Sequence, residues 1–435
     1  MSAQQPNNAS PPVGAPKDPA PKDPAATVSV SEATKRSWLA RLQPIFGLAI
    51  LATVAAFLPW KDQLIVPQDS GALSVSGTLE GDWRGAKVRF LPQVSVDPAE
   101  SKLPVELAEG ELALVRAESG HWNAPGFSGE LEVRPGLPRI FRSVDPLGLS
   151  AAMGFFFIAL LCGVTRWWRL LGLSGAGTRW VDCFRLTFLG LFFNLVMPGL
   201  TGGDVVKAVL AVKENPQRRA DALISVVIDR LFGLFTLVLL ATVVLWILGE
   251  TFAELRLPVS LLALCMGAAA LMYAHPALRR AVRFEKLLGS LPFGEKWLEL
   301  DRAVLRYAAH PVEVGLALIL SLGNHFGAIA GVMALGTAFG VTAEAIGWLD
   351  WVAIVPVANM ISSIPVAPGG WGVGEAAYAF LFGMVGESPA LGVAVSIGFR
   401  LCQLLLGLLG GLFLLLPGAR REWAEVENDL GPAGA

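Results

Sequence analysis

The stretch NLVMPGLTGGDVVK, residues 194–207, interrupts an apolar segment that is otherwise typical of a membrane-buried helix. It continues the apolar run 180–196 and introduces a proline, three glycines, an aspartate and a lysine. Non-helical backbone is tolerated at membrane depth only where protein or water satisfies its polar groups. The interruption therefore predicts that this part of the chain forms a site.

A second stretch, IPVAPGGWGVGE at 364–375, has the same form. Both stretches contain P-x-x-x-G-G, in which proline ends a helix and the glycines allow a tight reversal. Interrupted apolar segments at matching positions of two halves point to an inverted-repeat transporter. For either motif by itself, a plain loop between two short helices is the alternative. The predicted hairpin breaks are Pro198, Gly202, Gly203, Pro365, Gly369 and Gly370.

The composition is that of an integral membrane protein. Of the 435 residues, 54% are hydrophobic and only 16% are charged, whereas soluble domains carry roughly 25% charged residues. The net charge of −2 and the absence of a basic stripe argue against nucleic-acid binding. The four cysteines lie in apolar segments and the four histidines are far apart, so we expect no disulfide framework, metal site or cofactor.

Six apolar segments are long enough to cross a membrane, and the flanking charges give their direction. Arg166 and Arg169 mark a cytoplasmic flank, and basic residues lie on both sides of 180–212. A hairpin that enters and leaves from the cytoplasm satisfies both flanks, and by the same parity 350–387 is a hairpin from the outer face. The predicted full spans are 45–59, 147–164, 222–248, 257–273, 312–339 and 391–416.

The predicted fold is thus an all-α polytopic membrane protein with inverted repeats and two opposed re-entrant hairpins. A small β-rich extracytoplasmic insert at 61–145 accompanies it, since its segments alternate apolar and polar residues between turn signals. Trp83, Trp122 and Phe127 are candidates for its core. Residues 275–310 are expected to form amphipathic helices on the membrane surface. The predicted divisions are a disordered basic tail (1–43), a first transmembrane helix (44–60), the insert (61–145), the main transmembrane domain (146–418) and a tail (419–435), with both termini cytoplasmic.

Charged residues in the apolar segments are the candidate site, because ionisable groups at membrane depth are costly. Asp204 and Lys207 lie at i and i+3 and can pair, although Asp204 is also a plausible helix cap. Lys207 can hold a phosphate, and Asn194 can supply a neutral polar contact.

Asp229 and Arg230 are sequence neighbours and point about 100° apart on a helix. Arg230 suits a phosphate ligand, and a structural ion pair with another helix is the alternative. Glu375 either titrates with protons or caps its own helix, and Arg400 either pairs with Glu375 or binds an anion. The predicted substrate-binding residues are Asn194, Lys207, Arg230 and Arg400, and the predicted proton-coupling or ion-pair residues are Asp204, Asp229 and Glu375.

Three stretches in order, NLVMPGLTGGDVVK, SVVIDRLFGL and IPVAPGGWGVGEAA, resemble the transmembrane region of lysylphosphatidylglycerol synthases, the flippase-like half of those proteins. The resemblance implies a multi-pass protein of the bacterial inner membrane that moves a phospholipid or polyprenyl-linked lipid between leaflets. It places the family's acidic and basic positions on Asp204, Lys207, Asp229, Arg230 and Glu375. The insert 61–145 departs from the family pattern, and the residues after Pro417 are too few for an aminoacyltransferase domain, so lipid lysylation is not expected.

Three hypotheses for function follow. The first is a lipid flippase or transporter for an anionic phospholipid or a polyprenyl phosphate. The second is a membrane-embedded transferase with a lipid-linked donor, for which Asp62 after the first span is the only signal. The third is a non-catalytic partner or sensor that acts through the outer insert. No nucleophile triad or nucleotide-binding motif favours an enzyme, and a homo-oligomer remains an option.

Overall fold

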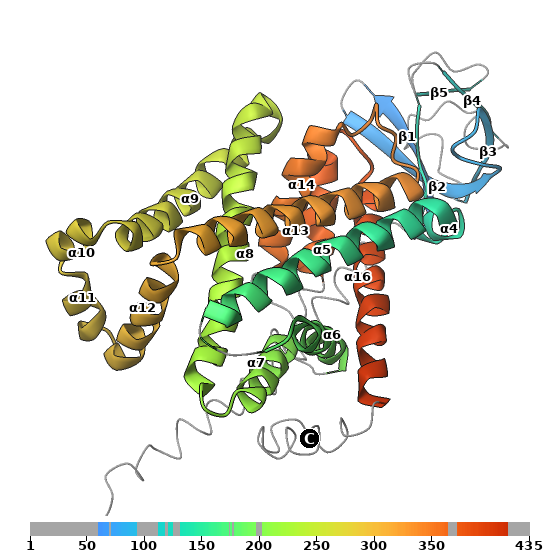
Figure 1. Ribbon diagram of the computed structural model, residues 1–435. Helices are drawn as coiled ribbons and strands as arrows, with labels where there is room; N and C mark the ends of the chain where they lie inside the picture. The colour runs from blue at the N-terminus through green and yellow to red at the C-terminus, as the bar shows by residue number, and fades with distance from the viewer. Residues whose placement is uncertain are drawn as a thin grey trace, which may run out of the picture.

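The computed structural model describes residues 60–68, 71–93, 112–117, 121–124, 131–173, 175, 178–196, 202–363 and 372–415. The predicted first span, both terminal tails, Phe127 and the break positions Pro198, Pro365, Gly369 and Gly370 lie outside the described residues. The described chain consists of a helical body with a β-sheet at one end of it (Figure 1).

Five helices of the described chain are long and apolar enough to cross a membrane. At 1.5 Å per residue, a helix of 28 residues exceeds the roughly 30 Å hydrocarbon core. These helices correspond to five of the six predicted spans, and the sixth lies outside the described residues. They are α5 (Pro146–Leu173), α8 (Arg219–Ile247), α9 (Ala253–Ala274, extended by the 3-10 turn Gly249–Phe252), α13 (Pro311–Ala338) and α16 (Pro389–Gly411).

The first of these helices is longer than predicted. Its apolar run was expected to end at 164, but α5 continues to Leu173. The two arginines that were interpreted as a cytoplasmic flank lie within the last turns of this helix and have acidic partners, Asp229 for Arg166 and Glu313 for Arg169. Their place on the cytoplasmic side stays a prediction.

Four shorter helices form two consecutive pairs. α6 (Trp180–Val196) packs against α7 (Gly202–Glu214), and α14 (Trp348–Ser362) packs against α15 (Val373–Met384). The α6–α7 pair starts and ends at the end of the body away from the sheet, where Asn215 Nδ2 donates to Thr178 Oγ1 at 3.2 Å. The α14–α15 pair starts and ends at the sheet side. Their opposed arrangement agrees with the predicted hairpins, and re-entry into a membrane stays a prediction.

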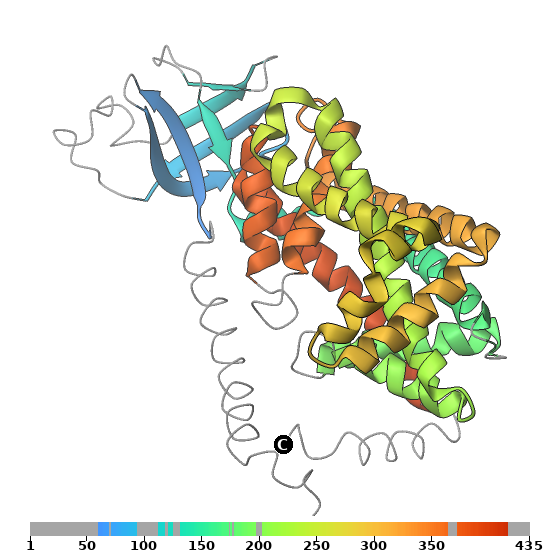
Figure 2. The same ribbon diagram turned by 90° about the vertical axis from the view of Figure 1, so that its left-hand side faces the viewer.

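The helices pack closely where glycines line the contact. α5 and α13 lie side by side along most of their length (Figures 1 and 2). Gly323, Gly327 and Gly331 recur every fourth residue of α13 and face α5. A β carbon at Gly327 would lie 3.0 Å from the Ala159 β carbon. Small residues at this spacing let two membrane helices approach backbone to backbone.

Three short helices follow α9 and form an arm at the side of the body (Figure 1). They are α10 (Pro276–Val282), α11 (Phe284–Ser290) and α12 (Gly294–Ala308). The Arg279 guanidinium donates two hydrogen bonds to Asp301, at 2.8 and 2.7 Å, and so ties α10 to α12. This carboxylate raises the pKa of the Arg279 guanidinium. The predicted helical character of 275–310 is confirmed, while its location on a membrane surface stays a prediction.

The insert forms an antiparallel sheet of six strands in the order β5-β4-β3-β2-β1-β6. Alternate residues such as Leu64, Val75 and Phe90 point into its core. Trp122 is buried there as predicted, and Trp83 contacts both this core and the helical core. The strands are β1 (Asp62–Gln68), β2 (Gly71–Glu80), β3 (Lys87–Pro92), β4 (Leu112–Arg116), β5 (Trp122–Asn123) and β6 (Glu132–Arg134).

The sheet is fastened to the helices at its entry and exit. Asp62 accepts hydrogen bonds from the backbone N–H of Leu79 and Gly136 and from Arg139 of α4 (Leu137–Arg142), at 2.8 to 2.9 Å. Arg84 of the sheet donates to the Ala338 carbonyl at the end of α13, at 3.1 Å. The chain therefore enters and leaves the sheet at neighbouring positions, close to the start of α5.

We predict that Gly331→Ala destabilises the protein, because the added β carbon would lie 2.4 Å from the Phe156 ring. Overpacking of this kind costs about 1–3 kcal/mol. Gly315→Ala in the same helix is the matched control, since a β carbon there meets no atom within 4 Å. The thermal unfolding midpoint of the purified protein in detergent should fall only for Gly331→Ala. Equal midpoints for the two variants would refute the close α5–α13 contact.

Candidate functional site

A group of charged side chains lies between α5, α7 and α8, and we call it the first cluster. It consists of Arg166, Asp204, Lys207, Asp229 and Arg230. Four of these five residues were predicted from the sequence as site residues. Asp229 and Arg230 each form an ion pair with another helix, which is the structural alternative stated for them, whereas the pair of Asp204 with Lys207 expected from spacing does not form among the described residues.

Asp204 pairs with Arg230 and not with Lys207. The carboxylate of Asp204 in the first turn of α7 accepts a hydrogen bond from Arg230 Nη2 of α8. The expected i, i+3 pair with Lys207 does not form among the described residues, because α8 brings a guanidinium closer. The Arg230 side chain is 62% exposed in the absence of a membrane, although protein atoms surround its guanidinium on most sides.

Lys207 is buried against an aromatic ring. Its Nζ atom lies 3.9 Å from the centre of the Trp167 ring of α5, a cation–π contact. The Trp167 indole N–H in turn donates to Ser225 Oγ of α8 at 3.2 Å. Within the described part of the chain, Lys207 has no carboxylate in salt-bridge contact. An ammonium with three donors and only a ring for a partner is suited to an anion.

Asp229 forms the buried ion pair of the cluster. Its Oδ1 accepts from Arg166 Nε at 2.7 Å, and both side chains are 7% exposed. Arg166 Nη1 also donates to Ser321 Oγ of α13 at 2.8 Å. Arg166 was not among the predicted site residues. The signal that could have revealed it is its place two turns before the end of an apolar helix, where a charge needs a partner.

Two glycines make room for this arrangement. A β carbon at Gly190 of α6 would lie 2.8 Å from the Gly203 carbonyl, so α6 and α7 touch backbone to backbone at the first break. A β carbon at Gly233 of α8 would lie 3.4 Å from the Arg166 guanidinium. The predicted break residue Gly203 is thus part of the close contact, and Gly202 is the first residue of α7.

The second break leads to a separate pair. Arg400 Nε of α16 donates to Glu375 Oε1 of α15 at 2.6 Å, which is one of the two alternatives expected for Arg400. Glu375 Oε2 also accepts from the Gly372 N–H at 2.6 Å, so this carboxylate caps its own helix. Gly372 has φ of 83° and starts α15 in a conformation that side chains rarely adopt. A β carbon at Gly374 would lie 2.6 Å from Arg400, so this glycine leaves space for the guanidinium.

The two groups are distinct within the described residues. Asp204, Lys207, Asp229 and Arg230 come together at the first cluster, whereas Glu375 and Arg400 meet on α15 and α16. Asn194 lies in the last turn of α6, beside the first break, and its side chain is outside the described atoms. Where the structure is described, no group of His, Cys, Asp or Glu could hold a metal ion.

The chemistry available at the first cluster is anion binding. One exposed guanidinium and one buried ammonium lie next to carboxylates that already have partners. Guanidinium and ammonium groups both bind phosphate, the first in a two-pronged way and the second as a point charge. Nothing in the cluster offers a nucleophile with an adjacent base, which a group-transfer reaction would use.

Comparison with known proteins agrees with this architecture. The model of the lysylphosphatidylglycerol synthase TM region matches residues 136–411. A UPF0104 membrane protein of Pyrococcus horikoshii is 26% identical over 310 residues, which cover 64% of this chain and 89% of that protein. No solved structure matches the chain.

The match starts directly after β6 and ends with α16, so it includes both helix pairs and both charged groups and leaves the sheet outside. It covers more than half of the chain, and the helices that it contains are those of a multi-pass membrane protein. The chain therefore belongs to the family of the lysylphosphatidylglycerol synthase transmembrane region.

Proposed function

We propose that the helical domain moves an anionic membrane lipid between the two leaflets, as a flippase or transporter. The observation that carries the proposal is the Arg230 guanidinium, which is exposed on a membrane helix and held by Asp204 at a helix break. A charge at that depth is costly unless it serves a pathway. A phosphate-bearing headgroup is the ligand class that fits, and an anionic phospholipid (a phosphodiester) or a polyprenyl phosphate (a phosphomonoester) would supply it.

In this proposal the first cluster exchanges one counter-ion for another. Asp204 holds Arg230 while the site is empty, and the lipid phosphate takes its place when it arrives. Lys207 of α7 adds a second positive charge. Within the described chain it contacts the Trp167 ring and has no paired carboxylate. Release follows when Asp204 returns to Arg230, so the site binds without trapping its ligand.

The two helix pairs supply the access routes. The α6–α7 pair opens away from the sheet and the α14–α15 pair opens toward it, which supports re-entrant hairpins that enter from opposite faces. Inverted repeats with discontinuous helices are the usual basis of alternating access. In this arrangement the sheet is extracytoplasmic, the membrane is the bacterial inner membrane and both termini are cytoplasmic. Asp204 is then the candidate for coupling movement to protons and Asn194 for a further ligand contact, whereas the Glu375–Arg400 pair would have to open before either residue could take such a role.

Asp62 was the only sequence feature that favoured the transferase alternative, and its contacts indicate a structural role. Asp62 was the acidic residue expected just outside the first span, but its carboxylate accepts from two backbone N–H groups and from Arg139. A carboxylate that is buried and fully occupied in this way has a structural role. The partner or sensor alternative depends on the sheet, which has its own surface and a pocket described below.

We predict that Arg230→Gln lowers the rate of lipid movement by about tenfold to a hundredfold, because a hydrogen bond to a charged group contributes about 1.5–3 kcal/mol. The measurement uses the purified protein in liposomes with labelled phosphatidylglycerol or polyprenyl phosphate and follows how much label is accessible in each leaflet. Protein-dependent movement should slow by this factor while the thermal unfolding midpoint is kept.

Arg306→Gln is the matched control for this experiment. Arg306 is 58% exposed and pairs with Asp221, so it resembles Arg230 in exposure and partner but lies on α12, outside the first cluster. This variant should move lipid like the wild type. Equal rates for Arg230→Gln and the wild type, in folded protein, would show that the site is elsewhere.

A second prediction separates structural charges from ligand charges. Asp229→Ala should lower the free energy of unfolding by about 3–5 kcal/mol, because it leaves Arg166 buried without its counter-ion. The double variant Arg166→Met/Asp229→Leu should recover most of that loss, since neither charge remains. Asp182→Ala breaks the largely exposed pair with Arg179 and should cost about 0–1 kcal/mol.

Unfolding curves in detergent check these values. Asp229→Ala with wild-type stability would contradict the assignment of a structural role to the buried pair.

A further inference from the structure

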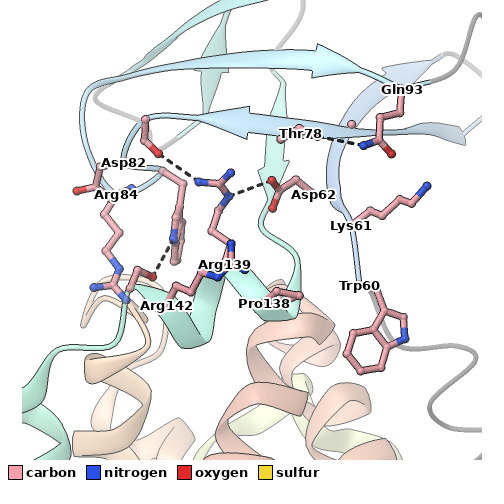
Figure 3. Close-up of a pocket in the computed structure, with 14 residues that line it drawn as sticks. Trp60, Lys61, Asp62, Thr78, Asp82, Arg84, Gln93, Pro138, Arg139 and Arg142 are labelled. Atoms are coloured by element: carbon pink, nitrogen blue, oxygen red, sulfur yellow. Dashed lines mark hydrogen bonds and ion pairs between the residues drawn. The ribbon is translucent and has the colours of Figure 1, made fainter.

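A cavity of about 620 Å³ lies between the sheet and α4, and we call it the sheet pocket. Its size is within the roughly 300–1,000 Å³ of small-molecule sites. Its walls come from the start of β1, the turn after β2 and the short helix α4 (Figure 3). None of the residues of the first cluster lines it, so it is a separate site.

Positive charge is in excess in the sheet pocket. Its charged residues are the cations Lys61, Arg84, Arg139 and Arg142 and the acids Asp62 and Asp82. Asp62 is fully used by Arg139 and two backbone N–H groups, and Asp82 accepts from the Arg84 N–H. Four cations and two acids give the lining of the pocket a formal net charge of +2.

The cations that remain are available to a ligand. Within the described residues, Lys61 and Arg142 form no hydrogen bond or ion pair, and both side chains are exposed. Arg84 donates from Nη2 to the Ala338 carbonyl, but its Nε atom is buried without a hydrogen-bond acceptor. This Nε atom is packed beside Gly340 and has no accessible surface, so Arg84 adds its charge to the pocket without offering Nε to a ligand. Figure 3 shows Lys61 at one side of the pocket and Arg84 at the other.

The pocket lies at the level where membrane helices end. Arg84 contacts the last residue of α13, and α4 leads within four residues into α5, two helices long and apolar enough to span. Trp60, 54% exposed, stands at its rim, and exposed tryptophans are enriched at the headgroup level of a membrane. Where α5 and α13 cross a membrane, their ends lie near the headgroup level, and the pocket beside these ends then faces lipid phosphates.

We propose that the sheet pocket binds the headgroup of an anionic membrane lipid, drawn there by the excess positive charge of Lys61, Arg84 and Arg142. The inference requires only that α5 and α13 cross the membrane, and it holds whether or not the first cluster moves lipid. The pocket would present the headgroup to the end of the helical body, while the acyl chains stay in the leaflet beside Trp60.

The test measures binding by calorimetry to the purified full-length protein in a neutral detergent. The probes are dihexanoylphosphatidylglycerol, dihexanoylphosphatidylcholine and inorganic phosphate. We expect the anionic lipid to bind more tightly than the other two and to lose affinity as salt is raised. Each of Lys61→Gln and Arg142→Gln should weaken its binding by about tenfold, because each removes one of the positive charges that line the pocket.

Lys87→Gln is the control, because Lys87 is an exposed lysine of the same sheet that does not line the pocket. It should bind like the wild type. Equal binding of phosphatidylcholine, or of inorganic phosphate, would overturn the assignment to an anionic lipid. Unchanged affinity in both Lys61→Gln and Arg142→Gln, or no binding to the wild type, would overturn the site. The unfolding midpoint of each variant confirms its fold.

Arg230→Gln separates the two proposals in the same assay. It should keep full affinity at the sheet pocket, since Arg230 lies on α8 outside it. If lipid binds normally at the sheet pocket but neither the wild type nor any variant moves lipid, the result would count against the proposed function alone. Normal movement with no binding at the pocket would count against this inference alone.

Discussion

The buried ion pair between Arg166 and Asp229 sets the geometry of the helical body. It joins α5 to α8, and the second donor of Arg166 adds Ser321 of α13. Two charges that leave water must be matched closely, because their desolvation is otherwise uncompensated. The pair therefore fixes the rotation of α8 about its axis. Asp229 points inward. Arg230 is the next residue, so it points about 100° away around the helix, toward α7.

The orientation of α8 thus explains both why Asp229 is buried and why Arg230 is exposed in the first cluster. Asp229 is satisfied from within the body, so it does not neutralise its neighbour Arg230. Arg230 is left with Asp204 at the start of α7, where a glycine contact between α6 and α7 brings the helix break close to α8. The proposed anion site lies where the architecture has satisfied one charge and left another accessible.

The sequence predicted the elements well because hydropathy and helix breakers act locally. The five spans of the described chain, the helical character of 275–310 and the β-rich insert all follow from patterns within a few turns of chain. The ion-pair partners of the charged residues were harder to predict. Asp204 was expected to pair with Lys207 at i+3, but lateral packing brought Arg230 to it, and the partner of Asp229 is 63 residues away. Arg166 was interpreted only as a flanking charge, because its partner Asp229 lies on another helix and sequence spacing does not show which helices are neighbours.

The entry and exit of the sheet lie side by side. β1 pairs with β6, and a β carbon at Gly136 would lie 2.8 Å from the backbone of Trp60 and Lys61. The family match begins at 136, so this junction is also the boundary of the shared helical domain. An excursion whose ends meet leaves the distance between the flanking segments unchanged. Modular gain or loss of the whole sheet during evolution would therefore require no rearrangement of the helices, and relatives with and without it can share one transmembrane architecture.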